Sequence, residues 1–510
     1  MRYLGVEYSQ KHIPALDPEF IPFGVWMNAY EAGANVPIAI AVERNEGFVS
    51  VRHAKIHGTA EMAAADYRFV ERYMKFLLWS IGGFRVYICG CSAIAQKLQQ
   101  AYTPEGERAF DYDFFGKLYE RPLEILDLPL EGCPAPNESP KPIGGHTEGC
   151  RIGFDAGGSD RTVSAVIDGE VVYSEEVVWH PKLNPDPSYQ YEGILDSFRT
   201  AASKMPRVDG IGVSSAGVFI GNAPMISSIF YCVPRDRWDE VKTVYDRAAA
   251  AIGDVPIVVA NDGDVTALAG AMGMGVGSIM GLAMGTSEAV GYVDKDMNVL
   301  GWISELAFAP VDLSENALVD EWSTDIGVGC KYFSQDAVIK LAPRAGIELD
   351  EALSPAEKLK VVQGLMEQDD PRAKAVFHDI GIYLAYAVVQ YSRFYDIKHM
   401  MVLGRVMSGK GGEEILSTCQ QVLADEFPQL YAGIQVMLPD ENTRRVGQSV
   451  AAASLPDIGC HQSKQEEIPC STKMRGFSAR ITSSIWALLR SKMAVLVPFC
   501  PNSYPKMLSI

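Results

Sequence analysis

The amino-acid sequence predicts a mixed α/β protein with more than one domain. A chain of 510 residues is too long for one ordinary hydrophobic core, so roughly two to four domains are expected. Three strand-like runs, IGFDAGG, TVSAVID and EVVYSEEVVW, follow one another from residue 152. Later strand-like runs alternate with helical segments, which is typical of a mixed sheet covered by helices.

The composition is that of a soluble globular protein. Apolar residues make up 48% and charged residues 21% of the chain, and the formal net charge is −19. Such a chain lacks the basic footprint of a nucleic-acid surface, so no nucleic acid is expected as a partner. The N-terminus has no signal-peptide pattern, and the nearest apolar window, residues 484–499, is interrupted by Arg490 and Lys492. We therefore expect a cytoplasmic protein without a membrane partner.

Residues 1–130 are expected to form an α/β domain. The runs at 37–44 and 47–56 predict two strands around a short turn, and residues 60–81 predict a helix. The apolar side chains of that helix recur every four residues: Phe69, Tyr73, Leu77 and Ile81. Residues 131–149 are rich in Pro, Gly, Ser and Asn and predict a linker.

The first candidate for chemistry is the turn that follows the run IGFDA. Asp155 ends the predicted strand, and Gly157, Gly158 and Ser159 follow it. Glycine allows backbone amides to approach a phosphate closely, and an aspartate can hold Mg²⁺ through water. Arg161, just beyond the turn, is a candidate to meet a phosphate oxygen. An ordinary hairpin turn has the same pattern, so both interpretations stay open at this point.

Two further glycine-containing loops follow apolar strands. Gly285 and Thr286 lie between two strand-like runs and offer backbone amides and a hydroxyl to a second phosphate. Gly404 ends another strand, and a loop with Gly409 leads into a helix. That loop suits an adenosine lying on backbone or a phosphate at a helix N-terminus. A surface hairpin and a common strand–loop–helix unit are the alternatives.

The pair Asn261-Asp262 comes directly after a buried strand, where a helix begins. A carboxylate at that place is well positioned to accept a proton from a substrate hydroxyl, which is the work of a general base. Asn and Asp are also favoured helix N-caps, and one of Asn261, Asp262 and Asp264 is expected to be the cap. A capping role at this turn does not exclude a catalytic role for Asp262.

Taken in order, these elements resemble the ROK family of sugar kinases. The order is a DxGGS turn, an Asn-Asp pair, a GTS turn, and then a strand with a glycine-rich loop and a helix. The segment SSAGVF (214–219) resembles the family's Pro-Gly substrate loop, with Ala216 where Pro is usual. The segment WISELAFAPVD resembles its Gly-Glu-Ile-Gly-His segment. The resemblance covers residues 151–458, roughly 60% of the chain.

The resemblance implies an actin-like ATPase (ribonuclease H-like) fold of two lobes, with the additional N-terminal α/β domain before it. Residues 150–262 together with 445–458 would form the small lobe, and residues 263–444 the large lobe. Residues 459–510 are basic, Ser-rich and aperiodic, and are expected to be a disordered or aberrant tail. A further hypothesis is that residues 1–130 are a degenerate copy of part of the actin-like unit.

The resemblance also implies a reaction, the transfer of the γ-phosphoryl group of ATP to a sugar hydroxyl with Mg²⁺ as cofactor. Asp262 would be the general base, and Asn261, Glu305 and Gly217 would contact the sugar. The implied ATP and phosphate contacts are Asp155, Gly157, Gly158, Ser159, Arg161, Gly285, Thr286, Gly404 and Gly409. Asp155 would also hold Mg²⁺ through water. A small sugar-like substrate and a homodimer are the implied partners.

Several positions depart from the family's pattern. Its Cys-rich zinc motif is missing, and no structural zinc is expected because the single Cys330 cannot bind it alone. Phe308 replaces the family's His, Tyr332 replaces a sugar-binding Glu, and Glu288 places a carboxylate beside the phosphate turn. Residues 404–406 replace a Gly-Gly-Gly run. Three functions therefore stay open: a sugar kinase, a non-catalytic sugar or nucleotide sensor, and another phosphotransferase with a non-sugar acceptor.

Overall fold

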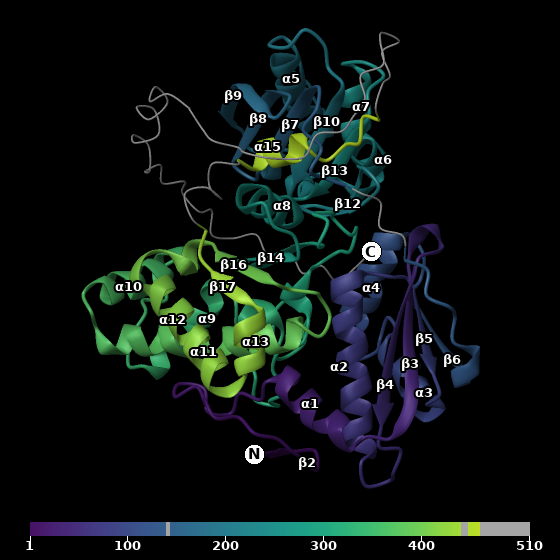
Figure 1. Cartoon of the computed structure of the whole chain (residues 1–510), viewed down its shortest axis with the longest axis vertical. Coiled ribbons are helices and arrows are strands. Elements are labelled where there is room, and N and C mark those ends of the chain that lie inside the picture. Colours follow the sequence, from purple (N-terminus) through teal and green to yellow (C-terminus); the bar gives the residue numbers. More distant parts are fainter. Residues whose placement is uncertain (139–142, 440–446, 460–510) are drawn as a thin grey trace. The chain divides into compact units, whose positions relative to one another are not determined.

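Three main β-sheets organise the part of the chain that the structure describes (Figure 1). The structure is a computed structural model, and it describes residues 1–138, 143–439 and 447–459. Nearly all of the predicted tail, and parts of the predicted linker and large lobe, lie outside the described residues, at 460–510, 139–142 and 440–446. The mixed α/β class predicted from the sequence is confirmed.

The first sheet has five strands in the order β13-β10-β7-β8-β9. Their bounds are β7 (Cys150–Ala156), β8 (Asp160–Ile167), β9 (Glu170–Val178), β10 (Gly210–Ser215) and β13 (Ile257–Asn261). β7, β8 and β9 form the predicted antiparallel meander, while β10 pairs in parallel with both β7 and β13. The carboxyl ends of β7, β10 and β13 therefore share one edge, where Asp155, Ser214 and Asn261 lie.

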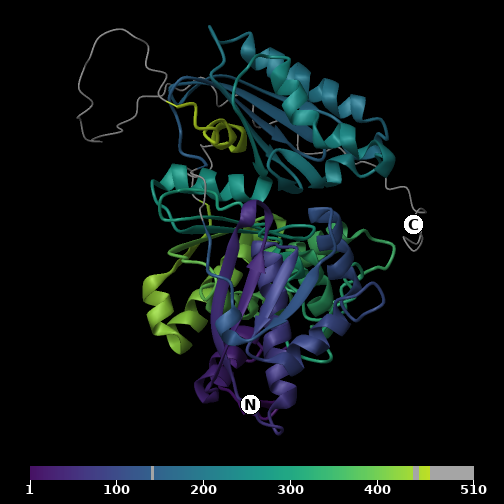
Figure 2. The ribbon, with the colours of Figure 1, turned by 90° about the vertical axis from the view of Figure 1, so that its right-hand side faces the viewer.

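Helices cover both faces of this sheet (Figure 2). They are α5 (Pro187–Ala202), α6 (Trp238–Lys242) and α7 (Val244–Ala250) on one face and α15 (Gln448–Ala453) on the other. A Cβ at Gly153 of β7 or at Gly212 of β10 would collide with the backbone of α15. These two glycines therefore let α15 lie directly on the sheet, which brings Gln448 to the carboxyl end of β10.

The second sheet has four strands in the order β15-β14-β16-β17. Their bounds are β14 (Ile279–Met284), β15 (Glu288–Val293), β16 (His399–Leu403) and β17 (Gln435–Met437). β15 is antiparallel to β14, whereas β14, β16 and β17 are parallel. This arrangement repeats that of β8-β7-β10-β13, and a bridge between Val293 and Val299 lies where a counterpart of β9 would pair. The repetition is the one expected of a two-lobed actin-like fold.

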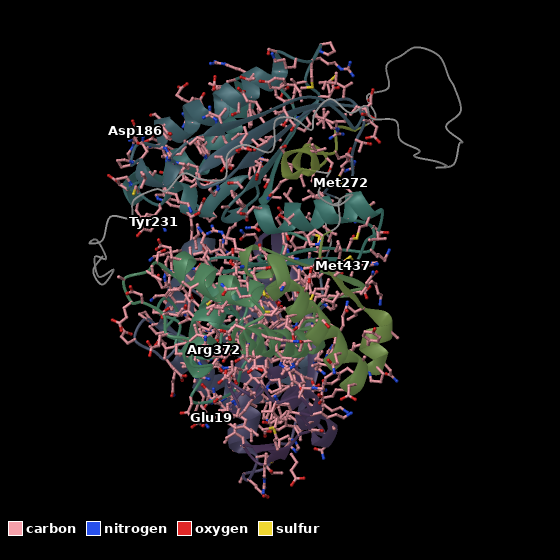
Figure 3. The ribbon with its side chains drawn as sticks, turned by 90° about the vertical axis from the view of Figure 1, so that its left-hand side faces the viewer. Glu19, Asp186, Tyr231, Met272, Arg372 and Met437 are labelled. Atoms are coloured by element: carbon pink, nitrogen blue, oxygen red, sulfur yellow. The ribbon has the colours of Figure 1, made fainter. Side chains whose placement is uncertain are left out.

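Helices surround the second sheet and connect it to the first. They are α8 (Asp262–Met274), α9 (Gln335–Arg344), α10 (Pro355–Glu367), α11 (Pro371–Tyr391), α12 (Gly409–Glu426) and α13 (Pro428–Gly433). α8 begins at the end of β13 and packs on β14 and β15. Its Met272 also faces the end of α15, where Ser454 Oγ lies 3.5 Å from the Met272 sulfur (Figure 3). α8 is therefore the element shared by both sheets.

The N-terminal region contains the third sheet, in the order β4-β3-β5-β6. Its elements are β3 (Val36–Glu43), β4 (Val49–Ile56), α2 (Ala63–Ile81), β5 (Arg85–Cys89), α3 (Ser92–Ala101), α4 (Ala109–Tyr119) and β6 (Glu124–Leu128). Here β3 and β5 are antiparallel, whereas the strands at the matching positions of the second sheet, β14 and β16, are parallel. This difference in direction argues against residues 1–130 being a degenerate copy of the later unit.

The remaining short elements lie at the N-terminus and after β10. They are β1 (Arg2–Tyr3), β2 (Val6–Glu7), α1 (Phe23–Gly33), β11 (Val218–Ile220) and β12 (Ala223–Ile226). The sequence interpretation did not include α1, α4, α6, α7, α9, α10 or α13. The first two are rich in aromatic side chains that recur around the helix rather than along one stripe, so no single apolar face stands out.

The N-terminal region shares its hydrophobic core with the second sheet and its helices. The ring of Phe76 stacks on Phe394 at a centroid distance of 4.0 Å, and Trp79 contacts Phe308 at 4.7 Å. One apolar cluster includes side chains from α1, α2, β3 and α11, and residues 1–459 form one compact unit. The predicted domain boundary near residue 130 therefore marks the end of the third sheet, but it does not separate two hydrophobic cores.

A buried charge cluster ties the N-terminal region to the loop that contains Asp325. Asp325 of that loop pairs with Arg72 at 2.7 Å, Lys75 at 2.9 Å and Arg108 at 2.8 Å. Burial alone would raise the pKa of Asp325, but the three cations hold it well below its usual range. The N-terminal region therefore supplies charges that fix this loop.

Candidate functional site

The turn after β7 forms the first part of the site. Trp179 Nε1 donates hydrogen bonds to the carbonyl oxygens of Gly157 at 2.8 Å and Asp160 at 3.0 Å, which fixes the turn. A Cβ at Gly158 would lie 2.6 Å from Lys182 Cε and 2.8 Å from Lys182 Nζ. The ammonium group of Lys182 therefore lies against the turn. It forms no ion pair with any residue in the described ranges. This ammonium group is therefore available to pair with a bound anion at the turn.

Two predicted phosphate contacts are engaged elsewhere. The guanidinium of Arg161 pairs with Asp196 at 3.0 Å and lies 5.7 Å from the centre of the Trp179 ring. The hydroxyl of Ser159 donates to Asp160 at 2.8 Å. A phosphate contact by Arg161 would require it to leave Asp196, whereas Lys182, which the sequence interpretation missed, already lies at the turn.

Asp155 and Asp262 are connected through a short polar chain. Ser214 Oγ donates to Asp155 Oδ1 at 2.7 Å. Gln448 Nε2 donates to Ser214 Oγ and to the backbone oxygen of Asp262, both at 2.9 Å. Burial raises the pKa of Asp155 to about 6; the Ser214 hydrogen bond lowers it, and the nearby Asp262 raises it. These hydrogen bonds connect Asp155, the metal-binding candidate, to Asp262, the candidate base.

Asn261 is the N-cap of α8, as one of the three alternatives predicted. Its Oδ1 accepts from the Gly263 amide at 2.7 Å, and its Nδ2 donates to Gly217 O at 2.8 Å. Asn261 thereby holds the loop after β10, where Gly217 has a φ of +138°. Asp262 is the first residue of α8, and burial raises the pKa of its carboxyl while Lys182 acts to lower it. A base with a raised pKa binds a proton more readily.

Three carboxyl groups interact electrostatically with Asp262. Burial raises the pKa of Asp264 to about 7, with a contribution from Asp262. Burial and the Asp262 charge raise the pKa of Glu305 to about 7. Asp155 is the third, on the phosphate side. Perturbed carboxyl groups of this kind gather at functional sites more often than elsewhere.

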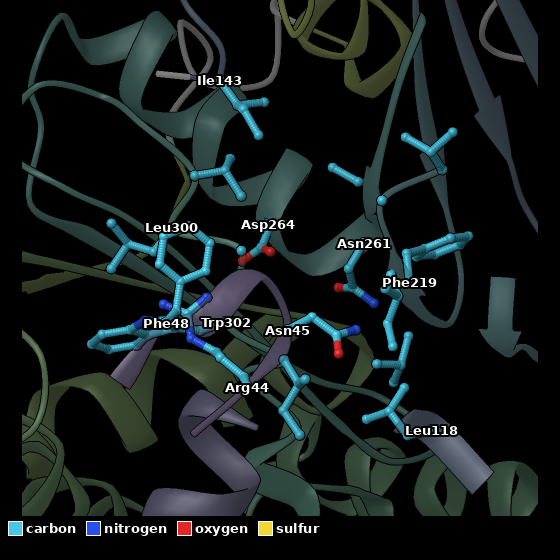
Figure 4. Close-up of a pocket in the computed structure, with 18 of the residues that line it drawn as sticks. Arg44, Asn45, Phe48, Leu118, Ile143, Phe219, Asn261, Asp264, Leu300 and Trp302 are labelled. Carbon is cyan, nitrogen blue, oxygen red and sulfur yellow. The ribbon is translucent and has the colours of Figure 1, made fainter. Parts of the chain in front are cut away.

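A cavity of about 220 Å³ opens beside Asn261 (Figure 4). Its polar lining includes Asn261, Asp264, Arg44 and Asn45, and the Gly217 loop forms part of its wall. Most other lining side chains are apolar or aromatic: Phe48, Leu118, Ile143, Phe219, Leu300, Trp302 and Ile303. The cavity thus joins two of the three predicted sugar contacts, Asn261 and Gly217, to a turn of the N-terminal region that the sequence interpretation did not place there, whereas Glu305 is not among its lining residues.

The predicted second phosphate turn, at Gly285 and Thr286, already makes hydrogen bonds within the protein. Gly285 O accepts from the Gln335 amide at 3.0 Å, and Thr286 is exposed. The Glu288 side chain is buried, and its Oε1 accepts from the Tyr391 hydroxyl at 3.1 Å. Burial raises the pKa of Glu288 to about 8, so its carboxyl is neutral at pH 7. Glu288 therefore places no charge beside the turn at neutral pH.

A carboxylate from another helix, Glu367 of α10, lies at the predicted adenosine loop. Gly404 packs against the Met284 backbone, and Gly409 begins α12 with a φ of +66°. Glu367 of α10 accepts from the Lys410 amide at 3.0 Å, at the N-terminus of α12. This is the place where a helix N-terminus would otherwise bind a phosphate. No local sequence pattern predicts this contact, because Glu367 lies 43 residues before Lys410.

The residues that depart from the family's pattern are packed into the core. Phe308 contacts the rings of Trp79 and Phe110 at 4.7 and 5.4 Å. Tyr332 is buried, and its hydroxyl donates to Asp312 at 2.5 Å. No group of three or more His, Cys, Asp or Glu side chains within the described ranges has a metal-binding arrangement. The same described part contains no helix long and apolar enough to cross a membrane.

Comparison with known proteins gives a likeness of fold. No family model matches the chain, and no curated protein matches it. A ROK family glucokinase from Streptomyces griseus, solved with glucose and AMPPNP, matches at 18% identity over 60% of this chain and 99% of that chain, with a TM-score of 0.42. The ROK hexokinase from Thermus thermophilus matches at 15% identity over 60% and 97% of the two chains, with a TM-score of 0.46.

A regulator is also among the matched structures. A ROK family transcriptional regulator, a homolog of the E. coli MLC protein, matches at 15% identity over 60% of this chain and 78% of that chain, with a TM-score of 0.48. The matched structures thus include two ROK family sugar kinases and a ROK family regulator.

Proposed function

We propose that the protein is an ATP-dependent kinase that transfers the γ-phosphoryl group to a hydroxyl of a sugar or sugar-like ligand. The observation that carries this proposal is the position of Asp262. Through Gln448 and Ser214 it is connected to Asp155 at the phosphate turn, and its neighbour Asn261 lines the cavity. A base between a phosphate-binding turn and an acceptor cavity is the arrangement that phosphoryl transfer needs.

The chain's own residues have distinct tasks in this reaction. Asp262 accepts the proton of the attacking hydroxyl, and its raised pKa favours that step. Asn261 holds the Gly217 loop and thereby the wall of the cavity. Lys182 stabilises negative charge at the Gly157–Gly158 turn, where backbone amides can approach a phosphate. ATP with Mg²⁺, when bound, supplies the phosphoryl group and neutralises part of its charge.

The fit for the cofactor differs between its two ends. At the phosphate end, Asp155 keeps one oxygen outside the Ser214 hydrogen bond, and the turn presents glycines and an ammonium group, which suits Mg²⁺ and phosphate. At the adenosine end, Glu367 already accepts the Lys410 amide, which does not suit a second anion. That observation favours a second candidate, a sensor that binds the sugar and does not turn over.

Substitution of Asp262 tests the kinase proposal. In an ATP-coupled assay with a set of hexoses, Asp262→Asn should lower turnover about 10²–10⁴-fold and leave ATP binding unchanged, because the amide cannot accept the proton. Asp246→Asn, at an exposed aspartate that accepts from Asn222, is the matched control and should keep wild-type turnover. Unchanged turnover in Asp262→Asn would refute the assignment of the base.

The sensor candidate makes the opposite prediction. A sensor should give no phosphorylated product with any hexose in the wild-type chain, while a sugar still raises the melting temperature. Detection of any sugar phosphate by mass spectrometry excludes the sensor as the sole function. These two experiments use the same purified full-length chain.

A further inference from the structure

The turn between β3 and β4 places an arginine in the cavity wall. Arg44 directly follows β3, and its backbone amide donates to Phe48 O at 3.0 Å, which closes the turn. Arg44 is 8% exposed, its guanidinium lies 4.9 Å from the centre of the Phe48 ring, and it lines the cavity. The N-terminal region therefore contributes directly to the site that Asn261 and Gly217 define.

The turn is held by two residues of the segment that follows β6, Asn137 and Glu138. Glu138 pairs with Arg44 and accepts from Ser50. Asn137 bridges to Val49 and donates from its side chain to Gly47 O at 2.8 Å. The turn is thus fixed before any ligand binds, and a fixed wall selects ligands at a lower entropic cost than a mobile one.

One buried donor of Arg44 has no partner. Its Nη2 is used by Glu138, but its Nε carries no hydrogen bond to any described residue. A buried donor without a partner is unfavourable, and a ligand oxygen that accepts from it would remove this cost. Figure 4 shows Arg44, Phe48 and Trp302 gathered at one side of the cavity, with Asn261 and Phe219 at the other.

The charges around the cavity favour an uncharged ligand. Arg44 is the one basic side chain among the described lining residues, and Glu138 already neutralises it. Asp264 adds an acidic group to the lining. An anionic ligand would lie beside this carboxyl group, whereas an ether or carbonyl oxygen can accept the Nε–H without adding charge.

We propose that the turn at Arg44–Phe48 is a specificity element that binds an uncharged apolar substituent on the ligand's ring. The ligand class is a hydroxylated ring with an aryl or alkyl substituent, attached through an oxygen that accepts from Arg44 Nε. The ring hydroxyls face Asn261 and Asp264, and the substituent packs between Phe48 and Trp302. This inference rests on the proposed function for the placement of the hydroxyls.

Calorimetric titration of the full chain without ATP tests the inference. The probes are glucose, galactose and mannose, their phenyl glycosides, and the matching uronates. We expect the phenyl glycoside of at least one series to bind at least tenfold more tightly than its parent sugar. Arg44→Lys should reduce that preference about tenfold, because lysine keeps the charge but lacks the Nε–H donor at this place.

Two further variants separate a specific effect from a general one. Phe48→Leu should reduce the preference by a similar amount because the aromatic face is lost. Arg85→Lys is the matched control: Arg85 lies on the same sheet and pairs with Glu43 and Glu124. It should bind all probes as the wild type does. Circular dichroism melting of each variant identifies any that has unfolded.

The outcomes distinguish this inference from the kinase proposal. Equal binding of phenyl glycosides and parent sugars, or identical effects of Arg44→Lys and Arg85→Lys, would overturn the inference. Tighter binding of a uronate than of its phenyl glycoside would also overturn it, since the ligand would then be anionic. Arg44-dependent binding of phenyl glycosides without phosphate transfer would support the inference and count against the kinase.

Discussion

The two sides of the predicted nucleotide site differ in what already occupies them. On the first sheet, the turn after β7 presents two glycines and the ammonium group of Lys182, which has no described ion-pair partner. On the second sheet, the corresponding elements are satisfied from within the chain, by Glu288 and Tyr391 near one turn and by Glu367 at the start of α12. One side is prepared for an anion, and the other carries carboxyl groups of its own.

The difference shows that a shared arrangement of strands does not fix the chemistry of the loops. β8-β7-β10-β13 and β15-β14-β16-β17 have the same order and directions. The side chains that reach their carboxyl ends come from other elements, such as the 3₁₀ turn Pro181–Leu183 for Lys182 and α10 for Glu367. Function must therefore be argued from those side chains, and each can be changed without altering a strand.

The largest expected effect concerns Glu288, whose carboxyl is buried and neutral at pH 7. Its folded pKa of about 8 lies above the ordinary value of 4.5, so its stabilising contribution is complete below pH 4.5 and is lost as the pH rises through 8. Glu288→Gln removes this ionisation and keeps an acceptor for Tyr391. At pH 9 the variant should be more stable than the wild type by on the order of 4 kcal/mol.

Urea unfolding of both proteins between pH 5 and pH 9 measures this effect. The difference in unfolding free energy between Glu288→Gln and wild type should grow with pH between pH 5 and pH 8 and level off above pH 8, because only the unfolded chain is ionised at this position between the two pKa values. Glu170→Gln, an exposed carboxylate on β9, is the control and should show no such trend. A constant difference across this range would show that Glu288 is ionised in the folded protein and that the second turn carries a charge.

The next effect concerns Lys182 on the open side. Lys182→Met removes the cation at the phosphate turn and should lower kcat/KM for ATP about 100-fold, since a charge-assisted hydrogen bond is worth about 1.5–3 kcal/mol. Lys182→Arg should restore most of it. The control is Lys204→Met, whose ammonium lies 4.8 Å from the Tyr173 ring centre in the same lobe. Equal kcat/KM values for Lys182→Met and Lys204→Met would contradict a phosphate role.

Much of the first sheet, and helix α2 of the N-terminal region, could be predicted from the sequence because their signals are local. The alternating runs before and after Gly157 predict the hairpin of β7 and β8, and the apolar run before Asn261 predicts β13 with a helix cap at its end. The four-residue spacing from Phe69 to Ile81 likewise predicts α2. In each case neighbours in the sequence are also neighbours in the element.

The rest depends on contacts between residues far apart in the chain. Lys182 reaches the turn from a segment 24 residues after Gly158, and Gln448 reaches Ser214 across 234 residues. Arg44 enters the cavity from a hairpin expected to belong to a separate domain. A charged or polar side chain outside an apolar pattern usually marks a solvated surface, so no local pattern distinguishes these three from ordinary surface residues.

The smallest expected effect concerns Glu367, which caps α12 on the closed side. Glu367→Gln keeps an acceptor for the Lys410 amide but removes a negative charge from a helix N-terminus, which should cost about 0.3–1 kcal/mol of stability. If that charge is what disfavours nucleotide phosphate at this loop, the variant should bind ATP several-fold more tightly. Asp369→Asn, whose partner is the exposed Lys410 ammonium at 2.7 Å, is the control. Calorimetry measures ATP binding by both variants. Equal affinities would show that α12 does not face the nucleotide. The contrast between the two sides of the predicted nucleotide site would then rest on Lys182 and Glu288 alone.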